Sequence, residues 1–360
     1  MKSVQGYLEI LDKGFGFLRT IENNFEATPA DPFVPAYLIK QSNLLEGVRI
    51  EGVGVKGNGK NKNLKLSRIE TVNGLPLASY AKLKPLQELV SINPSESFQL
   101  CQGPEDRMGK ALDMFVPIGK GQRGLIVSPP KSGKTTILKH IATSIQGHHP
   151  NTELYILLVD ERPEEVTDFK RALPGACVLS SSADQSVIQH IRMTRLAMNT
   201  ASRSAETGRD VVVLIDSLTR MSRAFNSQAQ SHGRTLSGGL AANALTVPRR
   251  IFGMARNIEK GGSLTVVATI LVDTGSRMDD VIFQEFKGTG NMDLVLSRAC
   301  AEQRIWPAIN INASGTRKEH LLMDKAAFQE AIAFRRKVAQ LDEITAMNAF
   351  HHYLDEMEAA

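Results

Sequence analysis

One loop constrains the fold of this 360-residue chain more than any other feature. The segment SPPKSGKT, residues 128–135, separates the apolar run LIVS from TTILKHIATSI, in which isoleucine and leucine recur at helical spacing. A loop that joins a strand to a helix presents backbone N–H groups and the positive end of the helix dipole to phosphate oxygens. The segment therefore predicts a site for the phosphates of a nucleotide.

The composition of this loop departs from the usual GxxxxGK[ST] pattern. Ser128 replaces the first glycine, and two prolines follow it. Lys134 would still reach the terminal phosphates and Thr135 would ligate magnesium, while Lys131 adds a second cation. The predicted nucleotide-contacting residues of the loop are Ser128, Pro129, Pro130, Lys131, Ser132, Gly133, Lys134, Thr135 and Thr136.

Two later apolar runs end in acidic residues. The run VVVLID ends at Asp216, and YILLVDER ends with Asp160, Glu161 and Arg162. At the C-terminal ends of parallel strands, Asp216 would lie near the phosphate loop to hold the magnesium shell, and Glu161 could polarise the attacking water. Each acid alone is equally compatible with a helix cap or a surface position. Together with the loop, at the ends of three expected strands, they indicate nucleoside triphosphate hydrolysis.

The order of apolar runs predicts two domains. From Gly121 onward, buried-strand runs alternate with helical or loop segments, which predicts an α/β domain with a mostly parallel sheet. Residues 1–73 instead hold short β segments with frequent turns, which predict a small barrel. We expect a barrel over residues 1–73, a connector over 74–115 and a nucleotide-hydrolysing domain over 116–360.

The overall composition excludes several classes of protein. The apolar runs are much shorter than the ~20 residues of a transmembrane helix, and the segment MKSVQGYLEI lacks a signal-peptide core. The three cysteines are too few and too scattered for a disulfide framework or a zinc site. We therefore expect a cytoplasmic protein with no membrane segment. The net charge of +5 is compatible with a polyanionic partner but is mild.

The segment DKGFGFLRT, residues 12–20, indicates what the barrel binds. Phe15, Phe17 and Arg19 would share one face of a strand. Exposed aromatic rings on a strand stack unpaired bases, and Arg19 would pair with a phosphate or stack as well. The alternative is that both phenylalanines are core residues and that Arg19 is merely exposed. The shared face favours nucleic-acid binding, because a fully buried face would not need an arginine.

These segments together resemble the Rho family of bacterial transcription termination factors. GFGFLR is similar to the ribonucleoprotein-type motif of cold-shock barrels, and the resemblance extends from about Gly6 to the C-terminal helices. Its most specific pieces are LIVSPPKSGKTT, LLVDERPEEVTD, LIDSLTR, GGLAANAL and SGTRKEH. A phosphate loop that contains two prolines is typical of this family.

The resemblance implies a homohexameric ring of RecA-like motor domains, each preceded by an oligonucleotide-binding, cold-shock-like barrel. Such a ring hydrolyses ATP with Mg²⁺, translocates 5′ to 3′ on single-stranded RNA as an RNA–DNA helicase, and displaces RNA polymerase. It also implies that Lys134 and Glu161 are catalytic and that Thr135 and Asp216 hold the metal. Arg317, one of several downstream arginines, would be contributed to a neighbouring subunit's site.

Further residues receive roles from the same resemblance. Arg162, Arg220 and Arg304 would belong to the nucleotide-site network. Residues 230–239 resemble the first pore loop and 273–278 the second, and their Arg234 and Arg277 stand where the family often has lysine. Either cation can hold a phosphate of RNA, but the planar arginine fork changes the grip.

Two features depart from the family pattern. The family commonly has a helical subdomain before the barrel, whereas this chain starts almost at the first expected strand. Phe33 stands where a tyrosine is usual, and KGNGKNKNLKL offers no aromatic residue where another is expected. We therefore expect primary RNA binding to be weaker or differently specific.

Three other classes of protein stay open on the residues alone. A rotary ATP synthase-type subunit shares the motor fold and begins with a barrel, but its barrel would not need GFGFLR. A DNA recombinase or replicative helicase is the second class. A pure RNA-binding module is the third, and it is disfavoured by Glu161 and Asp216.

Overall fold

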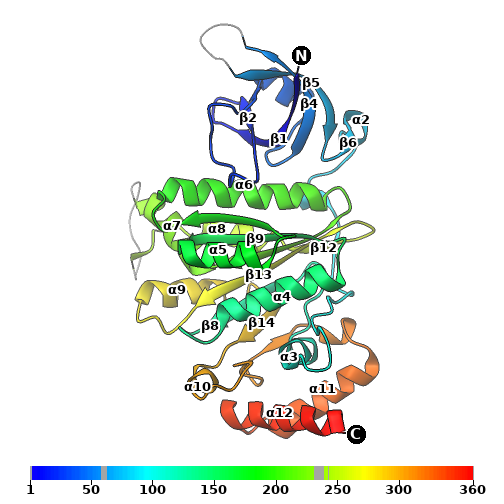
Figure 1. The fold of residues 1–360 in the computed structure, drawn as a ribbon, viewed down its shortest axis with the longest axis vertical. Helices are drawn as coiled ribbons and strands as arrows, with labels where there is room; N and C mark the ends of the chain where they lie inside the picture. Colours follow the sequence, from blue (N-terminus) through cyan, green and yellow to red (C-terminus); the bar gives the residue numbers. More distant parts are fainter. Residues whose placement is uncertain (1, 58–62, 231–238, 242, 360) are drawn as a thin grey trace.

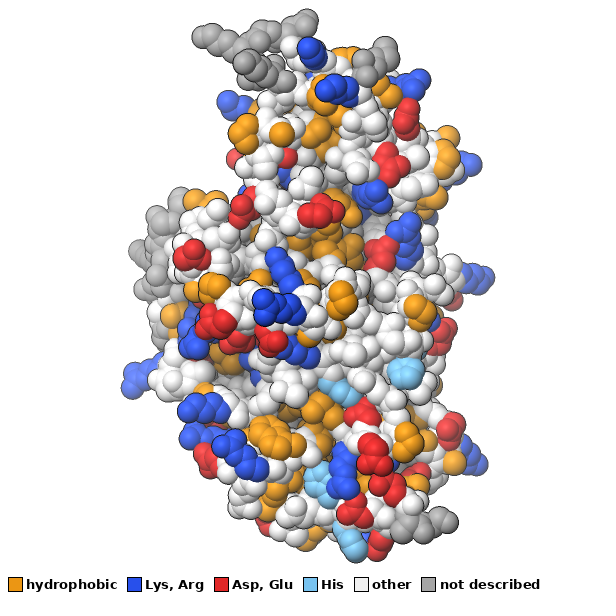
Figure 2. All heavy atoms as spheres, in the orientation of Figure 1, with side chains coloured by type: hydrophobic (Ala, Val, Ile, Leu, Met, Phe, Trp, Pro, Cys, Tyr) orange, Lys and Arg blue, Asp and Glu red, His pale blue; other side chains and the backbone are white. Residues whose placement is uncertain are grey.

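The structure is a computed structural model that describes residues 2–57, 63–230, 239–241 and 243–359. The N-terminal strands form a barrel, and the rest of the chain forms a larger α/β domain below it (Figure 1). In the space-filling view the barrel is a narrower head, and basic and acidic side chains are interspersed on the visible face (Figure 2).

The N-terminal sheet is 6-stranded, in the order β3-β2-β1-β4-β5-β6. A further pairing of β3 with β5 closes β1 to β5 into a barrel, and β6 pairs with β5 outside the ring. In β4 the buried residues alternate with more exposed ones, so that Ile50 points into the barrel while Arg49 and Glu51 point outward. Leu8, Leu18 and Leu66 join Ile50 in the barrel core. The elements are β1 (Lys2–Ile10), β2 (Gly16–Arg19), β3 (Phe33–Val34), α1 (Ala36–Gln41), β4 (Arg49–Lys56), β5 (Leu64–Val72) and β6 (Leu75–Pro76).

The segment expected to be a connector contributes to both domains. β6 pairs with β5 of the barrel, and β7 pairs with β12 of the α/β domain. The elements of this segment after β6 are α2 (Leu77–Tyr80), η1 (Leu86–Glu88), β7 (Ser91–Ile92) and α3 (Arg107–Phe115). The domain boundaries at residues 73 and 115 stay a prediction.

The sheet of the α/β domain has the order β10-β9-β11-β13-β8-β14-β15. Neighbouring strands are parallel from β10 to β14, and β15 is antiparallel to β14. The prediction of a mostly parallel sheet is confirmed. The strands are β8 (Arg123–Ser128), β9 (Glu153–Glu161), β10 (Cys177–Ser182), β11 (Asp210–Asp216), β12 (Arg256–Ile258), β13 (Ser263–Leu271), β14 (Met292–Val295) and β15 (Gly315–Thr316).

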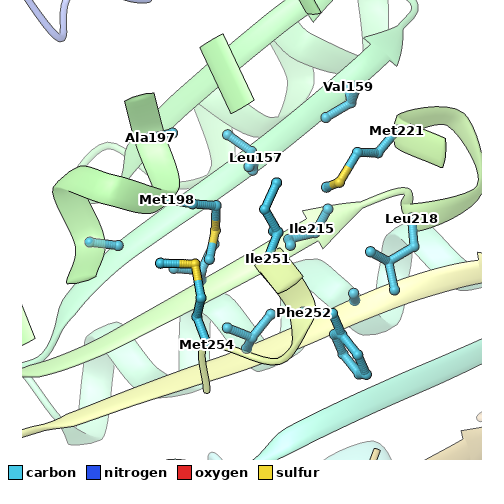
Figure 3. Packing of buried hydrophobic residues seen from close by; sticks show 14 of the residues in the cluster. Leu157, Val159, Ala197, Met198, Ile215, Leu218, Met221, Ile251, Phe252 and Met254 are labelled. Carbon is cyan, nitrogen blue, oxygen red and sulfur yellow. The ribbon is translucent and has the colours of Figure 1, made fainter. Parts of the chain in front are cut away.

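Helices cover both faces of this sheet, and the side chains of β9 show why its sequence is apolar throughout. Leu157 and Val159 pack in one hydrophobic cluster, while Ile156 and Leu158 pack in the other. On the face that carries Leu157 and Val159, Met198 of α6 and side chains of α7 and α8 pack against the sheet (Figure 3). The helices are α4 (Lys134–His148), α5 (Pro163–Ala172), α6 (Val187–Ala205), α7 (Leu218–Gln230), α8 (Thr246–Phe252), α9 (Arg277–Phe286), α10 (Arg298–Glu302), η3 (Glu319–Leu321), α11 (Lys325–Val338) and α12 (Glu343–Ala359).

Helix α6 connects the two domains in space. It runs between the barrel and the sheet, so the barrel rests on it (Figure 1). Among the residues that the structure describes, no helix combines the length and the apolar character needed to span a membrane.

Candidate functional site

The phosphate loop lies between the end of β8 and the start of α4, as predicted. Its shape is held from within, because the Ser132 hydroxyl donates to the Pro129 carbonyl at 2.7 Å and lies 3.0 Å from the Ser128 hydroxyl. Both serines are buried. Gly133 has a φ of 89°, in the left-handed region that glycine adopts without strain, just before Lys134 begins the helix. The loop therefore turns sharply into a helix N-terminus.

Three charged residues from different elements meet beside this loop. The Lys134 ammonium forms an ion pair with Asp216 at the end of β11 and lies 3.9 Å from Oε2 of Glu161 at the end of β9. The Thr269 hydroxyl donates to Oδ1 of Asp216 at 2.9 Å. The expectation that parallel strands bring these acids to the phosphate loop agrees with this geometry. Their catalytic and metal-binding roles stay predictions.

The environment of Glu161 distinguishes it from Asp216. Burial, together with the neighbouring Asp216 carboxylate, raises the pKa of the Glu161 carboxyl, while Arg220 and Lys134 oppose this rise. Arg220 reaches Oε1 at 3.3 Å and also donates to the Asp160 carbonyl. Oε2 is buried and has no hydrogen-bond partner among the described residues. That oxygen is free to accept a hydrogen bond from a water molecule.

The donor chemistry beside the loop fits magnesium. Mg²⁺ prefers oxygen ligands and usually keeps several waters, with one or two protein carboxylates and the phosphates of its substrate. The Thr135 hydroxyl and the Asp216 carboxylate supply such oxygens. The described residues contain no group of three or more His, Cys, Asp and Glu that could hold an ion alone. A magnesium ion held by Thr135 and Asp216 would complete its shell with water and with the phosphates of a nucleotide.

Trp306 is a site residue that the sequence did not reveal. A Cβ atom built on Gly133 would lie 2.8 Å from the indole ring, so the ring is packed against the phosphate loop. The side chain is 40% exposed, and it is the only tryptophan of the chain. Trp306 lies far from the loop in sequence and in no recognised motif, so the sequence carried no signal for its place beside the loop.

The remaining predicted arginines occupy different places. Arg162 is exposed and its backbone N–H donates to Oε1 of Glu161 at 3.1 Å. Arg304 and Arg317 are exposed. Arg317 follows β15, whose partner strand begins opposite Gly124, whereas the phosphate loop follows Ser128 at the other end of β8. At ~3.3 Å per strand residue the two ends lie ~13 Å apart, so Arg317 follows a strand at the opposite end of β8 from the phosphate loop.

The barrel brings its predicted aromatic residues together. The ring centroids of Phe15, Phe17 and Phe33 lie 5.5 to 6.0 Å apart, with Phe33 on β3 directly opposite Phe17 on β2. All three side chains are half-buried and lie outside the barrel core, so the alternative that they are core residues is wrong. We call these three residues the aromatic cluster. Partly exposed rings of this kind can stack unpaired bases.

Arg19 is predicted to pair with a phosphate or to stack, but the structure buries its side chain beside two acidic residues. Its side chain is 5% exposed, because it forms ion pairs with Glu9, at 2.6 Å, and with Asp31. The guanidinium also lies 4.8 Å from the centre of the Phe17 ring. The strand period correctly placed Arg19 on the same face as Phe17, but it could not reveal the two acids that cover the charge. Arg19 therefore packs against the Phe17 ring from the buried side and stabilises the aromatic cluster.

A buried ion-pair network continues from this arginine into the α/β domain. Glu9 also accepts hydrogen bonds from Arg192 of α6, and Arg192 donates to the Phe25 carbonyl at 2.7 Å. Burial disfavours the charged form of Glu9, but the two arginines hold its pKa below the ordinary value. Removing one partner of such a buried network costs about 3–5 kcal/mol, so the network fixes the barrel to α6.

The two expected pore loops are tied to one helix. Arg234, in the first loop, lies outside the described residues. Arg277, in the second, is exposed at the start of α9. Behind it, the buried Asp279 accepts from Arg223 of α7 at 2.9 Å, and Asn226 of α7 holds the backbone of Ala241, after the first loop.

Two family models match the chain. The model for the Rho termination factor RNA-binding domain matches residues 4–77. The model for the nucleotide-binding domain of the ATP synthase alpha/beta family matches residues 109–316. The first match covers the barrel and the second covers the phosphate loop with its strand-end acids.

Relatives of known function cover nearly the whole chain. The transcription termination factor Rho of Chromobacterium violaceum is 45% identical over 347 residues, which span 95% of this chain and 82% of the relative. The factor of the same name from Aquifex aeolicus is 46% identical over 347 residues, or 96% and 80% of the two chains.

Solved structures share the fold at lower identity. An ATPase from the type III secretion system of pathogenic bacteria is 24% identical and has a TM-score of 0.62 over 70% of each chain. The assembled ATPase EscN of enteropathogenic E. coli is 23% identical, with a TM-score of 0.58 over 71% of this chain and 61% of its own. At such identity the likeness shows the fold alone.

Proposed function

This chain belongs to the Rho family of transcription termination factors, and we propose the roles through which its residues perform that function. It is an ATP-hydrolysing factor with an RNA-binding domain that acts in transcription termination. The proposal adds that a homohexameric ring translocates 5′ to 3′ along single-stranded RNA and displaces RNA polymerase. The proposal rests on one observation: Lys134, Asp216 and the unpartnered Oε2 of Glu161 lie together beside the phosphate loop.

The phosphate loop binds the triphosphate of ATP. Backbone N–H groups of residues 131–135 and the helix dipole of α4 favour the negative charge, whereas Pro129 and Pro130 have no N–H to donate. With ATP bound, Lys134 would exchange its contact with Asp216 for the terminal phosphates, and Thr135 and Asp216 would hold a magnesium ion, whose charge would offset that of the phosphates. Trp306, half-exposed against the loop, offers an aromatic face on which the adenine base stacks.

Glu161 orients the attacking water. Its free Oε2 accepts a hydrogen bond from that water, while Arg220 fixes the other oxygen of the carboxylate. The raised pKa of Glu161 brings its proton affinity closer to working pH, which suits a group that accepts a proton in the transition state. Asp216, paired with a lysine and a threonine, is better suited to hold a metal.

An arginine from a second subunit completes the site. Arg220 already contacts Glu161 and Asp160, and Arg317 follows a strand at the opposite end of β8 from the phosphate loop of its own chain. A ring in which Arg317 reaches the neighbour's terminal phosphate uses this exposed cation. Such an arginine can accelerate phosphoryl transfer by ~10³-fold or more.

Helix α7 couples the nucleotide site to the RNA. Within three turns it presents Arg220 to Glu161, Arg223 to the second loop and Asn226 to the chain that leaves the first loop. A shift of α7 on hydrolysis would therefore move both loops, with Arg277 gripping a phosphate. RNA that favours one loop position would, by reciprocity, favour one state of the nucleotide site.

One assay tests the proposal. ATP hydrolysis is measured without polymer, with poly(C) RNA and with single-stranded DNA. Stimulation by RNA alone is the expected result. Stimulation by DNA would favour a recombinase or replicative helicase, and a high rate that no polymer changes would favour a rotary subunit, which shares this fold.

A further inference from the structure

A cleft of about 460 Å³ opens where the barrel meets α6. One wall is the hairpin between β1 and β2, including Phe15 of the aromatic cluster. The other wall is formed by α6 and the last turns of α7. We call this the junction cleft. Its lining residues from the α/β domain include Ile188, Arg192, Arg195 and Gln228.

A second cleft, of about 200 Å³, lies on the other side of Arg195. It lies between α6 and α8 and is lined by Arg250 together with neutral residues such as Gln87 and Asn199. It contains two arginines and no acidic residue among its described lining residues. We call this the basic cleft. Arg195 forms part of the wall of both clefts, so the two adjoin.

Some charged residues of these clefts have ion-pair or hydrogen-bond partners, and others have no ion-pair partner among the described residues. In the junction cleft, Glu9 is held by Arg19 and Arg192, and Glu46 accepts from Asn199 at 2.7 Å. The exposed pair Asp12 and Lys13 cancels in net charge. Arg195 and Arg250 are both exposed, and neither forms an ion pair within the described part of the chain. The junction cleft is lined by equal numbers of acidic and basic residues, and Glu46 has only the neutral Asn199 as a side-chain partner among the described residues. The excess positive charge therefore lies in the basic cleft, at Arg195 and Arg250.

We propose that the junction cleft and the basic cleft form one track for the single-stranded RNA that leaves the aromatic cluster. Arg195 holds a backbone phosphate where the clefts meet, and Arg250 holds another farther along. The inference rests on the proposed function, since it assumes that the barrel captures RNA.

Three observations favour RNA as the occupant. Phe15 belongs both to the aromatic cluster and to the wall of the junction cleft, so the track is continuous with the surface of the RNA-binding domain. The unpaired charges are arginines, whose planar forks suit phosphate. The track also ends on α7 and α8, the helices on either side of the first loop.

The test compares Arg195→Ala and Arg250→Ala with Arg336→Ala. Arg336 is also an exposed helical arginine without an ion pair in the described residues, but it lies on α11, far from both clefts. Binding is measured for pyrimidine oligonucleotides of about 4 and about 12 nucleotides, the range of site sizes for one such barrel. Salt dependence is measured for the longer one. All measurements use the full chain, repeated with Arg277→Ala so that the second loop contributes no phosphate contact.

We expect the two track variants to bind the short oligonucleotide as the unchanged protein does. For the long one they should bind more weakly, and the slope of log K against log salt should fall by about 0.7 for each lost phosphate contact. Arg336→Ala should behave as the unchanged protein. An unaltered slope would overturn the track and leave these clefts to a protein partner, and an equal loss for both lengths would show damage to the barrel instead. If the unchanged protein binds neither RNA, the proposed capture by the barrel fails.

Discussion

The aromatic cluster of the barrel and the phosphate site of the motor domain are built by opposite means. The cluster takes two of its three rings from one hairpin and leaves them half-exposed. The phosphate site gathers Lys134, Glu161 and Asp216 from elements far apart in sequence, and buries both acids to 1% exposure. Stacking on an exposed platform tolerates many bases, whereas phosphoryl transfer depends on fixed charges in a site shielded from water. Capture and turnover should therefore respond to different substitutions.

The largest expected effect is that of Arg317→Ala on turnover. Removing the arginine supplied across the interface should lower RNA-stimulated hydrolysis by ~10³-fold or more, because the terminal phosphate loses a cation in the transition state. Mixing Arg317→Ala subunits with Lys134→Ala subunits should restore part of the activity, since some interfaces then combine an intact loop with an intact arginine. No recovery in any mixture would place Arg317 in the site of its own subunit.

A similar but smaller loss is expected for Glu161→Gln. The amide cannot accept the proton of the attacking water, so turnover should fall by ~10²- to 10⁴-fold. ATP binding, measured by fluorescence titration, should stay nearly unchanged because the phosphate loop is intact. Normal hydrolysis by this variant would remove Glu161 from the catalytic role.

The double substitution of Phe15 and Phe17 by alanine tests the other region. Each stacked base contributes about 1–3 kcal/mol, so affinity for a short pyrimidine oligonucleotide should fall by ~10-fold or more. Nucleotide binding without polymer should be unaltered. Circular dichroism serves as the control, and an unfolded barrel would mean that these rings support the fold rather than bind RNA.

The smallest effect concerns pH. Hydrolysis needs ionised Glu161, and its folded-state pKa is raised, so protonation begins at a higher pH than for an ordinary glutamate. As the pH is lowered, the rate of single-turnover hydrolysis should therefore begin to fall at a higher pH than the pH at which an ordinary carboxylate becomes protonated. The aromatic cluster contains no carboxyl group with a raised pKa, so its affinity for RNA should stay constant over the same pH range. A rate profile that follows an unshifted carboxyl would contradict the assigned environment.

The sequence predicted the motor site better than its surroundings. Glu161 and Asp216 were predictable because parallel strands place all their carboxyl ends at one edge of the sheet. Trp306 was not, since its contact with Gly133 depends on the path of the chain beyond β14. Its approach to the phosphate loop is a tertiary contact with no periodic signature.

In the barrel, the spacing of residues along a strand predicted only which side chains share a face. The period of a strand correctly grouped Phe15 with Phe17, and it placed Arg19 beside Phe17. Whether that face is open to solvent depends on what else packs there, and Glu9 and Asp31 bury the arginine. Strand parity therefore identifies neighbours, but long-range partners decide whether a charge is available to RNA.

The separation of capture from turnover is tested most directly by Arg277→Ala. RNA-dependent ATPase activity and affinity for a short pyrimidine oligonucleotide are measured on the same preparation. We predict that RNA stimulation of hydrolysis falls while affinity for the short oligonucleotide is unchanged, because Arg277 lies in a motor loop that α7 links to Glu161 and not in the barrel. Unchanged stimulation, or equal loss of stimulation and affinity, would contradict the account.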